Sequence, residues 1–138
     1  LFQEIREKRG LAYTTYAFDS PYSDTGAWGM YAGTAPERAS EVEKLMQAEL
    51  EKLAATGPRE DELVRVHGQL RGGMALGLED TLSRMSRLGR AELSGRYFTV
   101  DAALARIEAV QAEDVRSLAE ELARRCVFTA EVVPEDRA

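Results

Sequence analysis

The sequence predicts an α+β fold, a two-layer sandwich in which several helices cover one face of a small, mainly antiparallel sheet. Residues 12–18 and 27–33 are rich in aromatic and small residues and flank a polar turn, a pattern that favours a hairpin of two strands. Apolar residues then recur at helical spacing over most of residues 37–124. Because so small a sheet cannot cover so many helices, we expect further N-terminal strands to be missing.

The first 18 residues predict a helix followed by a strand. Leu1, Phe2 and Ile5 are apolar with charged residues between them, and Gly10 ends this segment after two basic residues. In the strand, period-two alternation places Tyr13, Thr15 and Ala17 on one face. Ala12, Thr14, Tyr16 and Phe18 form the more apolar face. We expect this second face, including Tyr16 and Phe18, to pack beneath the helices.

The remaining elements follow in order along the chain. Trp28, Met30 and Ala32 should share one face of the second strand. Thr34-Ala35-Pro36-Glu37 predicts a helix start capped by Thr34, and Gly57-Pro58 predicts its end. The spacing predicts further helices over about residues 60–78, 81–93, 101–110 and 112–124, and the apolar run from Cys126 to Val133 predicts a last strand.

Length and the first residue bear on the domain organisation. A chain of 138 residues predicts one domain, residues 1–138. Leu1 is not an initiator Met and opens directly into a helical pattern, so we expect the domain to be truncated at its N-terminal end. No apolar run reaches the roughly 18 residues of a membrane span, which predicts no membrane partner. The sequence does not specify the compartment, and we favour the cytoplasm.

Charge and cysteine content exclude several function classes. The chain has 24 acidic and 18 basic residues, a net charge of −6, which argues against a nucleic-acid partner. With a single cysteine, Cys126, it can form neither an internal disulfide nor a zinc site built from thiolates. Gly10, Gly26, Gly29 and Gly33 do not follow the order of a phosphate loop, so a nucleotide-binding module is disfavoured.

The chain does not contain the residues of a complete catalytic site. His67 is the only histidine and the motif H-x-x-E-H is absent. We interpret His67 as a packed or boundary residue and Cys126 as a small buried apolar residue. Four glycines in the predicted second long helix each cost about 1 kcal/mol relative to Ala. We expect them to allow close helix packing: Gly68, Gly72, Gly73 and Gly77.

Arg6 and Tyr13 form the one pair of residues that suggests chemistry. Arg6 lies in the opening helix, and Tyr13 begins the first strand on the less apolar face. A guanidinium and a phenol that converge there could donate hydrogen bonds to a carbonyl oxygen that gains negative charge. An exposed Arg and a Tyr in a strand are also common without any catalytic role, so the residues alone leave both interpretations open.

The opening segment is the most specific motif of the chain: residues 1–13, Leu-Phe-Gln-Glu-Ile-Arg-Glu-Lys-Arg-Gly-Leu-Ala-Tyr. It resembles the insulinase/pitrilysin family of zinc metallopeptidases (the inverzincins), in particular the C-terminal, non-zinc domain of its processing-peptidase branch. Weaker matches follow in order along nearly the whole chain: Gly33-Thr34-Ala35-Pro36-Glu37, Glu62-Leu63, residues 78–85 and residues 109–115. Arg59 departs from the family, which usually has a Thr or Ser helix cap at this position.

The resemblance implies a function that this chain shares with another domain. In the family, H-x-x-E-H and a downstream Glu hold zinc in an N-terminal domain, and an Arg/Tyr pair contacts the substrate near the scissile carbonyl. That pair matches Arg6 and Tyr13, which are therefore implied to be catalytic, with no metal-binding or cofactor-binding residue in this chain. The implied activity is zinc-dependent cleavage of peptides or unfolded segments in an enclosed chamber.

The resemblance also implies partners and leaves one alternative open. The zinc domain would be part of the same polypeptide or a partner subunit, in a homo- or heterodimer, and the substrate would be a peptide. The family also includes non-catalytic scaffolds and subunits that carry only half of the active site. Because both Arg6 and Tyr13 are present, the enzyme is favoured over the scaffold, and this domain alone should be inactive and free of metal.

Overall fold

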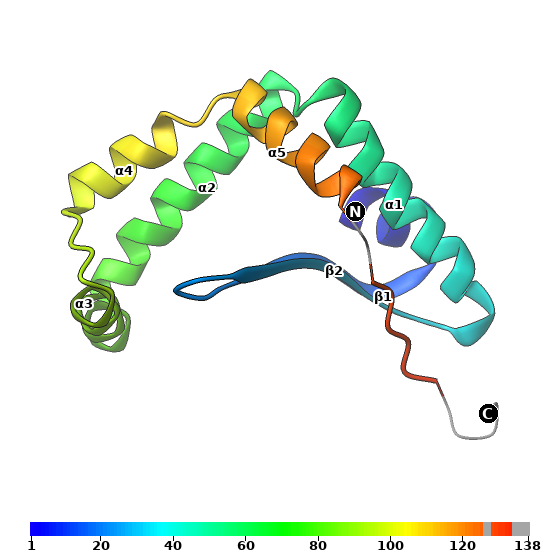
Figure 1. The fold of residues 1–138 in the computed structure, drawn as a ribbon, viewed down its shortest axis with the longest axis horizontal. Coiled ribbons are helices and arrows are strands. Elements are labelled where there is room, and N and C mark those ends of the chain that lie inside the picture. Colours follow the sequence, from blue (N-terminus) through cyan, green and yellow to red (C-terminus); the bar gives the residue numbers. More distant parts are fainter. Residues whose placement is uncertain (126–127, 134–138) are drawn as a thin grey trace. The chain divides into compact units, whose positions relative to one another are not determined.

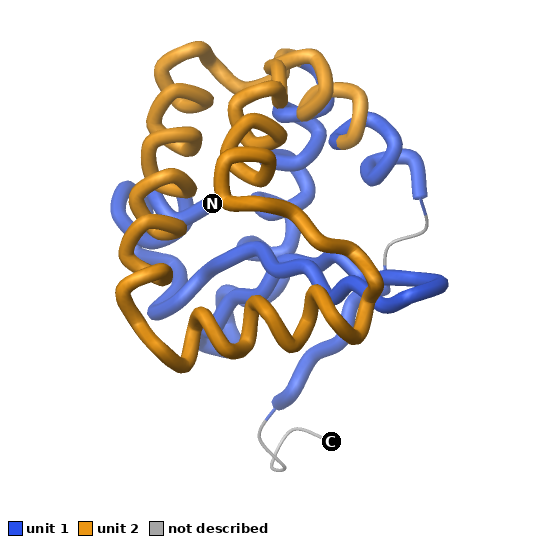
Figure 2. Tube along the Cα trace, turned by 90° about the vertical axis from the view of Figure 1, so that its left-hand side faces the viewer, with its two compact units in different colours: residues 1–55, 119–138 blue, residues 56–118 orange. Residues whose placement is uncertain are grey.

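A computed structural model of the protein describes residues 1–125 and 128–133. The chain divides into two compact units (Figure 2). Unit 1 contains residues 1–55 together with the chain from residue 119 onwards, and unit 2 contains residues 56–118. The strands lie in unit 1, and unit 2 is helical in its described residues.

Unit 1 begins with a short π-helix and a hairpin. The helix η1 spans Phe2–Glu7, and the strands β1 (Ala12–Pro21) and β2 (Gly26–Thr34) pair in antiparallel fashion (Figure 1). The predicted hairpin is therefore confirmed. Thr34 does not cap a helix as predicted, because its hydroxyl donates a hydrogen bond to the carbonyl of Leu11. Ala35 is extended, as is usual before a proline. A 3-10 turn, η2 (Pro36–Arg38), then leads into α1 (Ala39–Thr56).

Two small apolar clusters connect the hairpin to helices. In the first, Ile5 and Ala12 pack against Val42 of α1, with Ala32 of β2 at its margin. In the second, Leu50 and Ala54 of α1 pack with Ala119 of α5 (Ala112–Arg124), and Met30 of β2 contacts this cluster. Met30 and Ala32 thus face the helices, as expected for alternate positions of a strand. This helical layer over one face of an antiparallel pair confirms the α+β fold class.

A bulge in β1 reverses the expected alternation of the strand. Ala12 pairs with Thr34 and Thr14 with Gly33, so the register shifts between these two pairs. One extra residue moves every later side chain to the opposite face. Thr15 is therefore buried with Ala12, while Tyr16 and Phe18 are 49% and 43% exposed. The prediction that Tyr16 and Phe18 pack beneath the helices is wrong.

Gly10 joins η1 to β1 in a conformation that favours glycine. Its φ is +59°, and its N–H donates to the carbonyl of Arg6 at 3.0 Å. The next residue closes the same turn, since the N–H of Leu11 donates to the carbonyl of Ile5 at 2.9 Å. This turn determines how the helix that carries Arg6 leads into the strand that carries Tyr13.

Replacing Gly10 with Ala should lower the stability of the protein by about 1 kcal/mol, because a Cβ is strained at positive φ. Thermal unfolding followed by circular dichroism should show a lower Tm. Gly68→Ala is a suitable control. A Cβ at Gly68 meets no atom within 4 Å, so that change should raise Tm through helix propensity. Equal shifts in Tm for both variants would contradict this account of the turn.

Unit 2 contains α2 (Glu60–Glu79), α3 (Thr81–Ser94), α4 (Val100–Glu108) and the first part of α5. These helices begin and end close to their predicted residues. At the start of α2 the backbone N–H of Arg59 donates to the Glu62 carboxylate at 3.0 Å, so a capping interaction forms without Thr or Ser. The Arg59 guanidinium donates to Asp61 and holds the pKa of that carboxyl below its usual range.

α3 and α4 begin at side-chain caps. Asp80 accepts a hydrogen bond from the backbone N–H of Ser83 at 2.7 Å, and hydrogen bonding to Ser83 lowers the pKa of this carboxyl. Thr99 accepts from the N–H of Ala102 at 3.1 Å. α3 ends at Gly95, whose φ of +64° is left-handed. These caps fix the start of each helix and the end of α3.

Two further predictions are corrected. A Cβ added at Gly68, Gly72, Gly73 or Gly77 would meet no atom within 4 Å beyond the helix's own nearby backbone, so close packing against the described residues does not explain these glycines. No strand forms over residues 128–133, where a last strand is predicted. The sheet in the described residues consists of β1 and β2 alone. Cys126 lies outside the described residues. None of the described helices is long and apolar enough to cross a membrane.

Candidate functional site

Arg6 and Tyr13 each follow a residue that is anchored in the core of unit 1. Ile5 has no exposed surface and Ala12 is 7% exposed, and both pack in the cluster that contains Val42. Burial of these neighbours restrains the backbone on either side of the Gly10 turn. The sequence therefore places both predicted site residues on backbone that is restrained by apolar packing, and the side chains themselves lie outside the core.

The Arg6 side chain is exposed and stacks on an aromatic ring. Its guanidinium carbon lies 4.8 Å from the centroid of the Phe2 ring. A guanidinium over a ring face gains a cation–π attraction and keeps its N–H donors in its own plane. Among the described residues no carboxylate pairs with Arg6. Stacking on Phe2 thus orients the group and leaves its donors available to a partner outside this chain.

Tyr13 lies at the bulge and is 80% exposed. The sequence places Tyr13 on the less apolar face of the strand, and the side chain is exposed in the structure. In the part of the chain that the structure describes, its hydroxyl forms no hydrogen bond, either with Arg6 or with another residue. A bulge next to a functional residue is a common way to redirect a side chain. The fold does not need this hydroxyl, so it is available to a ligand.

Sequence reasoning missed an aromatic surface on the same hairpin, which we call the aromatic platform: Tyr16, Phe18 and Tyr31. Tyr16 and Tyr31 are paired across the strands, and their rings stack with centroids 5.1 Å apart. Phe18 lies 6.2 Å from Tyr16. The rings are exposed on the face opposite Met30 and Ala32. The predicted alternation of β1 conceals this surface, because it places Tyr16 and Phe18 beneath the helices.

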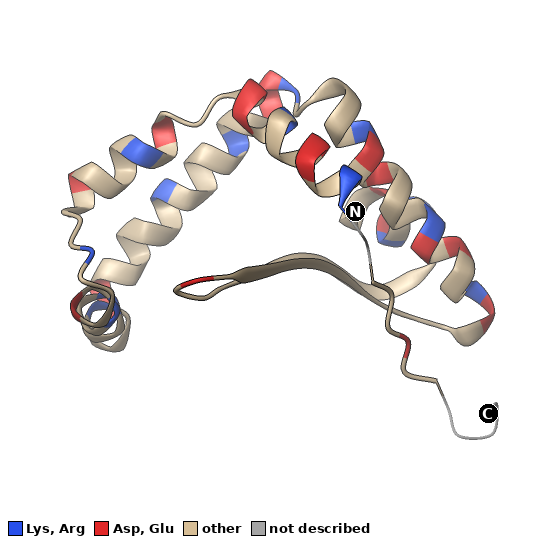
Figure 3. Cartoon of the chain, viewed as in Figure 1, with Lys and Arg blue, Asp and Glu red and all other residues tan. Residues whose placement is uncertain are grey.

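Glycines make room for the aromatic platform, and the strands carry almost no charge. A Cβ at Gly29 would lie 2.7 Å from Cζ of Phe18, so the ring occupies the space of the missing side chain. Asp19 is the only charged residue in β1 and β2, and Figure 3 shows the hairpin as almost entirely uncharged. Such a surface suits apolar or aromatic groups and offers little to a charged ligand.

No metal site can be assembled from the described residues. They contain no group of three or more His, Cys, Asp or Glu side chains that could hold an ion. His67 is half-buried in α2, as predicted, and its Nε2 atom has no hydrogen-bond partner among them. A tetrahedral zinc site needs at least three protein ligands, and the surroundings of His67 do not supply them.

Comparisons with known proteins find a matching family and several similar proteins. Residues 1–70 match the family described as the peptidase M16 inactive domain. An uncharacterized zinc protease of Streptomyces coelicolor is 46% identical over 126 residues, which cover 91% of this chain and 28% of that protein. The uncharacterized zinc protease YmxG of Bacillus subtilis is 37% identical over 123 residues, 88% of this chain and 30% of that protein.

A solved structure has the same fold. The crystal structure of a peptidase M16 inactive domain from Pseudomonas fluorescens superposes with a TM-score of 0.76 at 22% identity, covering 86% of this chain and 28% of that one. The chain thus spans less than a third of the length of the relatives it matches.

Proposed function

Because the chain belongs to the peptidase M16 family, whose inactive domain matches residues 1–70, we propose that it is the C-terminal, zinc-free part of a zinc metalloendopeptidase. The observation that carries the proposal is the state of Arg6 and Tyr13. Both side chains are exposed and lack a polar partner among the described residues, although the backbone next to each is anchored in the core. Polar groups held in this way are free to bind a substrate.

In the proposed mechanism this domain stabilises charge on the substrate. Attack of water on a peptide carbonyl places negative charge on the carbonyl oxygen. The Tyr13 hydroxyl and the Arg6 guanidinium donate hydrogen bonds to that oxygen, and the positive charge of Arg6 strengthens its contribution. Zinc would be held by a homologous N-terminal domain, since the described residues here do not fit such a site. No step at the metal is therefore assigned to this chain.

The aromatic platform supports a peptide as the substrate. Tyr16 and Phe18 follow Tyr13 along β1, and with Tyr31 they form an exposed apolar surface. Apolar side chains of an extended peptide or an unfolded segment could lie on these rings while a carbonyl meets Tyr13. The N-terminal domain would complete an enclosed chamber, either from the same polypeptide or from a partner subunit in a homo- or heterodimer.

Zinc content and peptide hydrolysis should distinguish this domain from the complete enzyme. We expect the isolated chain to bind no stoichiometric zinc and to cleave no peptide, because its described residues contain no group of three His, Cys, Asp or Glu side chains that could hold the ion. The complete enzyme, this chain together with its zinc domain, should contain one zinc and hydrolyse a quenched fluorescent peptide. Chelation should abolish hydrolysis and added zinc should restore it. Elemental analysis and fluorescence measure the two quantities.

Two results would count against the proposal. One tightly bound zinc in the isolated chain would mean that this domain has a metal site of its own. A complete protein that holds zinc but cleaves no peptide from a varied library would favour a non-catalytic scaffold.

A further inference from the structure

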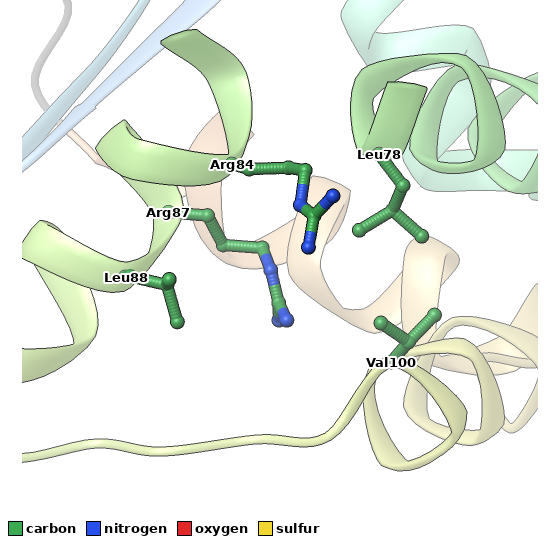
Figure 4. Close-up of a pocket in the computed structure, with 5 residues that line it drawn as sticks. All are labelled: Leu78, Arg84, Arg87, Leu88 and Val100. Atoms are coloured by element: carbon green, nitrogen blue, oxygen red, sulfur yellow. The ribbon is translucent and has the colours of Figure 1, made fainter. Parts of the chain in front are cut away.

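Unit 2 contains a cavity that the proposed catalytic role does not use. It has a volume of about 490 Å³, and its apolar walls include Leu70, Met74 and Leu78 of α2 and Ile107 of α4. A neighbouring hollow of about 400 Å³ shares Leu78, Arg84 and Arg87 and extends to Val100. Figure 4 shows both arginine side chains extending from α3 toward the space beside Leu78 and Val100. Small-ligand sites are commonly 300–1,000 Å³ in volume.

The two arginines of this cavity lack the ion pairs that other arginines of the chain form. In the described part of the protein neither Arg84 nor Arg87 pairs with a carboxylate, and no acidic residue lines either hollow. Arg87 donates to the carbonyl of Phe98 at 3.1 Å, which orients its guanidinium. Acidic residues outnumber basic ones, and they pair with several arginines: Arg59, Arg65, Arg71, Arg116, Arg124 and Arg125.

Glycines widen the cavity along α2. Gly73 and Gly77 line it, and a Cβ at either position would meet no atom within 4 Å. Neighbouring side chains in the described part of the chain would therefore allow a larger residue at both positions. Glycine is nevertheless present, although it disfavours a helix. A ligand seated against the backbone of α2 would use this space.

We propose that this cavity binds the C-terminal residue of a peptide. The free carboxylate would accept hydrogen bonds from Arg84 and Arg87, since guanidinium groups match the planar, two-oxygen geometry of a carboxylate. The apolar side chain of that residue would lie between α2 and α4, against Met74 and Ile107. The choice of a peptide as the source of the carboxylate rests on the proposed function, whereas the preference for an apolar anion rests on the cavity itself.

Binding can be measured without hydrolysis. The complete enzyme is treated with a chelator and titrated, by fluorescence anisotropy, into a labelled pentapeptide of four alanines and a C-terminal leucine. We expect the free acid to bind at least about tenfold more tightly than the C-terminal amide, because the amide loses a charge-assisted contact. Arg84→Gln should remove this preference for the acid. Gly77→Leu should fill the cavity and weaken binding at least about tenfold.

Gly68→Leu is the matched control, because Gly68 lies on the same helix, does not line the cavity and has open space around it. It should bind like the wild type, and thermal melts should show that all variants are folded. Equal affinity for acid and amide, wild-type binding by Arg84→Gln, or binding of decanoate without any binding of the peptide would each overturn the proposal. The Tyr13→Phe variant should bind the pentapeptide like the wild type. Loss of pentapeptide binding and loss of hydrolysis therefore test the cavity proposal and the catalytic proposal separately.

Discussion

Replacing Tyr13 with Phe should lower the kcat of the complete enzyme by about 100- to 1000-fold, the range for loss of one donor to an oxyanion. KM should change little, because the hydrogen bond strengthens only as charge develops on the oxygen. The variant keeps the ring and removes a hydroxyl that has no partner among the described residues. Since Tyr13 is 80% exposed, the folded state should be almost equally stable.

Initial rates of peptide hydrolysis over a range of substrate concentrations give the two constants. Tyr22→Phe is the matched control, because Tyr22 follows β1 in the hairpin turn and is 69% exposed. It loses the same hydroxyl and should retain full activity. Wild-type turnover in Tyr13→Phe, with unchanged thermal melts, would remove the catalytic role and favour the scaffold alternative.

Replacing Arg6 with Lys should lower kcat by about 10- to 100-fold, the effect of losing one charge-assisted hydrogen bond. An ammonium keeps the charge but cannot reproduce the planar arrangement of donors. It also loses part of the stacking on Phe2, whose ring centroid lies 4.8 Å from the guanidinium carbon.

The matched control is Arg9→Lys, an equivalent change at an exposed residue near the end of the same segment. It should leave kcat and KM unchanged in the same hydrolysis assay. A kcat in Arg6→Lys equal to that of Arg9→Lys would mean that Arg6 contributes only its net charge, and the geometric part of the mechanism would be wrong.

The helices and the hairpin could be predicted because their signals are local. Apolar spacing located α2 to α5, and Gly57-Pro58 marked the end of α1. The exposed site residues could also be predicted, since Arg6 and Tyr13 lie beside apolar positions in one continuous segment. Local sequence patterns therefore predict the helices, the hairpin and the candidate residues Arg6 and Tyr13.

The bulge at Tyr13 could not be predicted from the alternation of residues. An extra residue in a strand depends on its pairing with β2 and on the simultaneous burial of Ile5 and Ala12, which are tertiary features. One such residue reversed the face assigned to Tyr16 and Phe18 and so concealed the aromatic platform. The missing last strand has a similar cause, because the pairing of an apolar run with the edge of a sheet is decided by tertiary contacts and not by its composition.

The cavity of unit 2 also depends on contacts between distant parts of the chain. Arg84 and Arg87 belong to α3, whereas Val100 and Ile107 come from α4. Glycines in a helix are a signal in the sequence, but close packing is the simpler interpretation of them. The open space around Gly73 and Gly77 shows that packing against the described residues is not the reason.

The most direct test of the central claim compares the affinity of a transition-state mimic for two enzymes. A peptide phosphonate carries a tetrahedral anion where the substrate has a planar carbonyl, and such mimics report transition-state binding. We predict that Tyr13→Phe raises the inhibition constant of the phosphonate by the same factor, about 100- to 1000-fold, by which it lowers kcat/KM. Equal inhibition constants for the wild type and Tyr13→Phe would contradict the claim that this domain donates to the oxyanion.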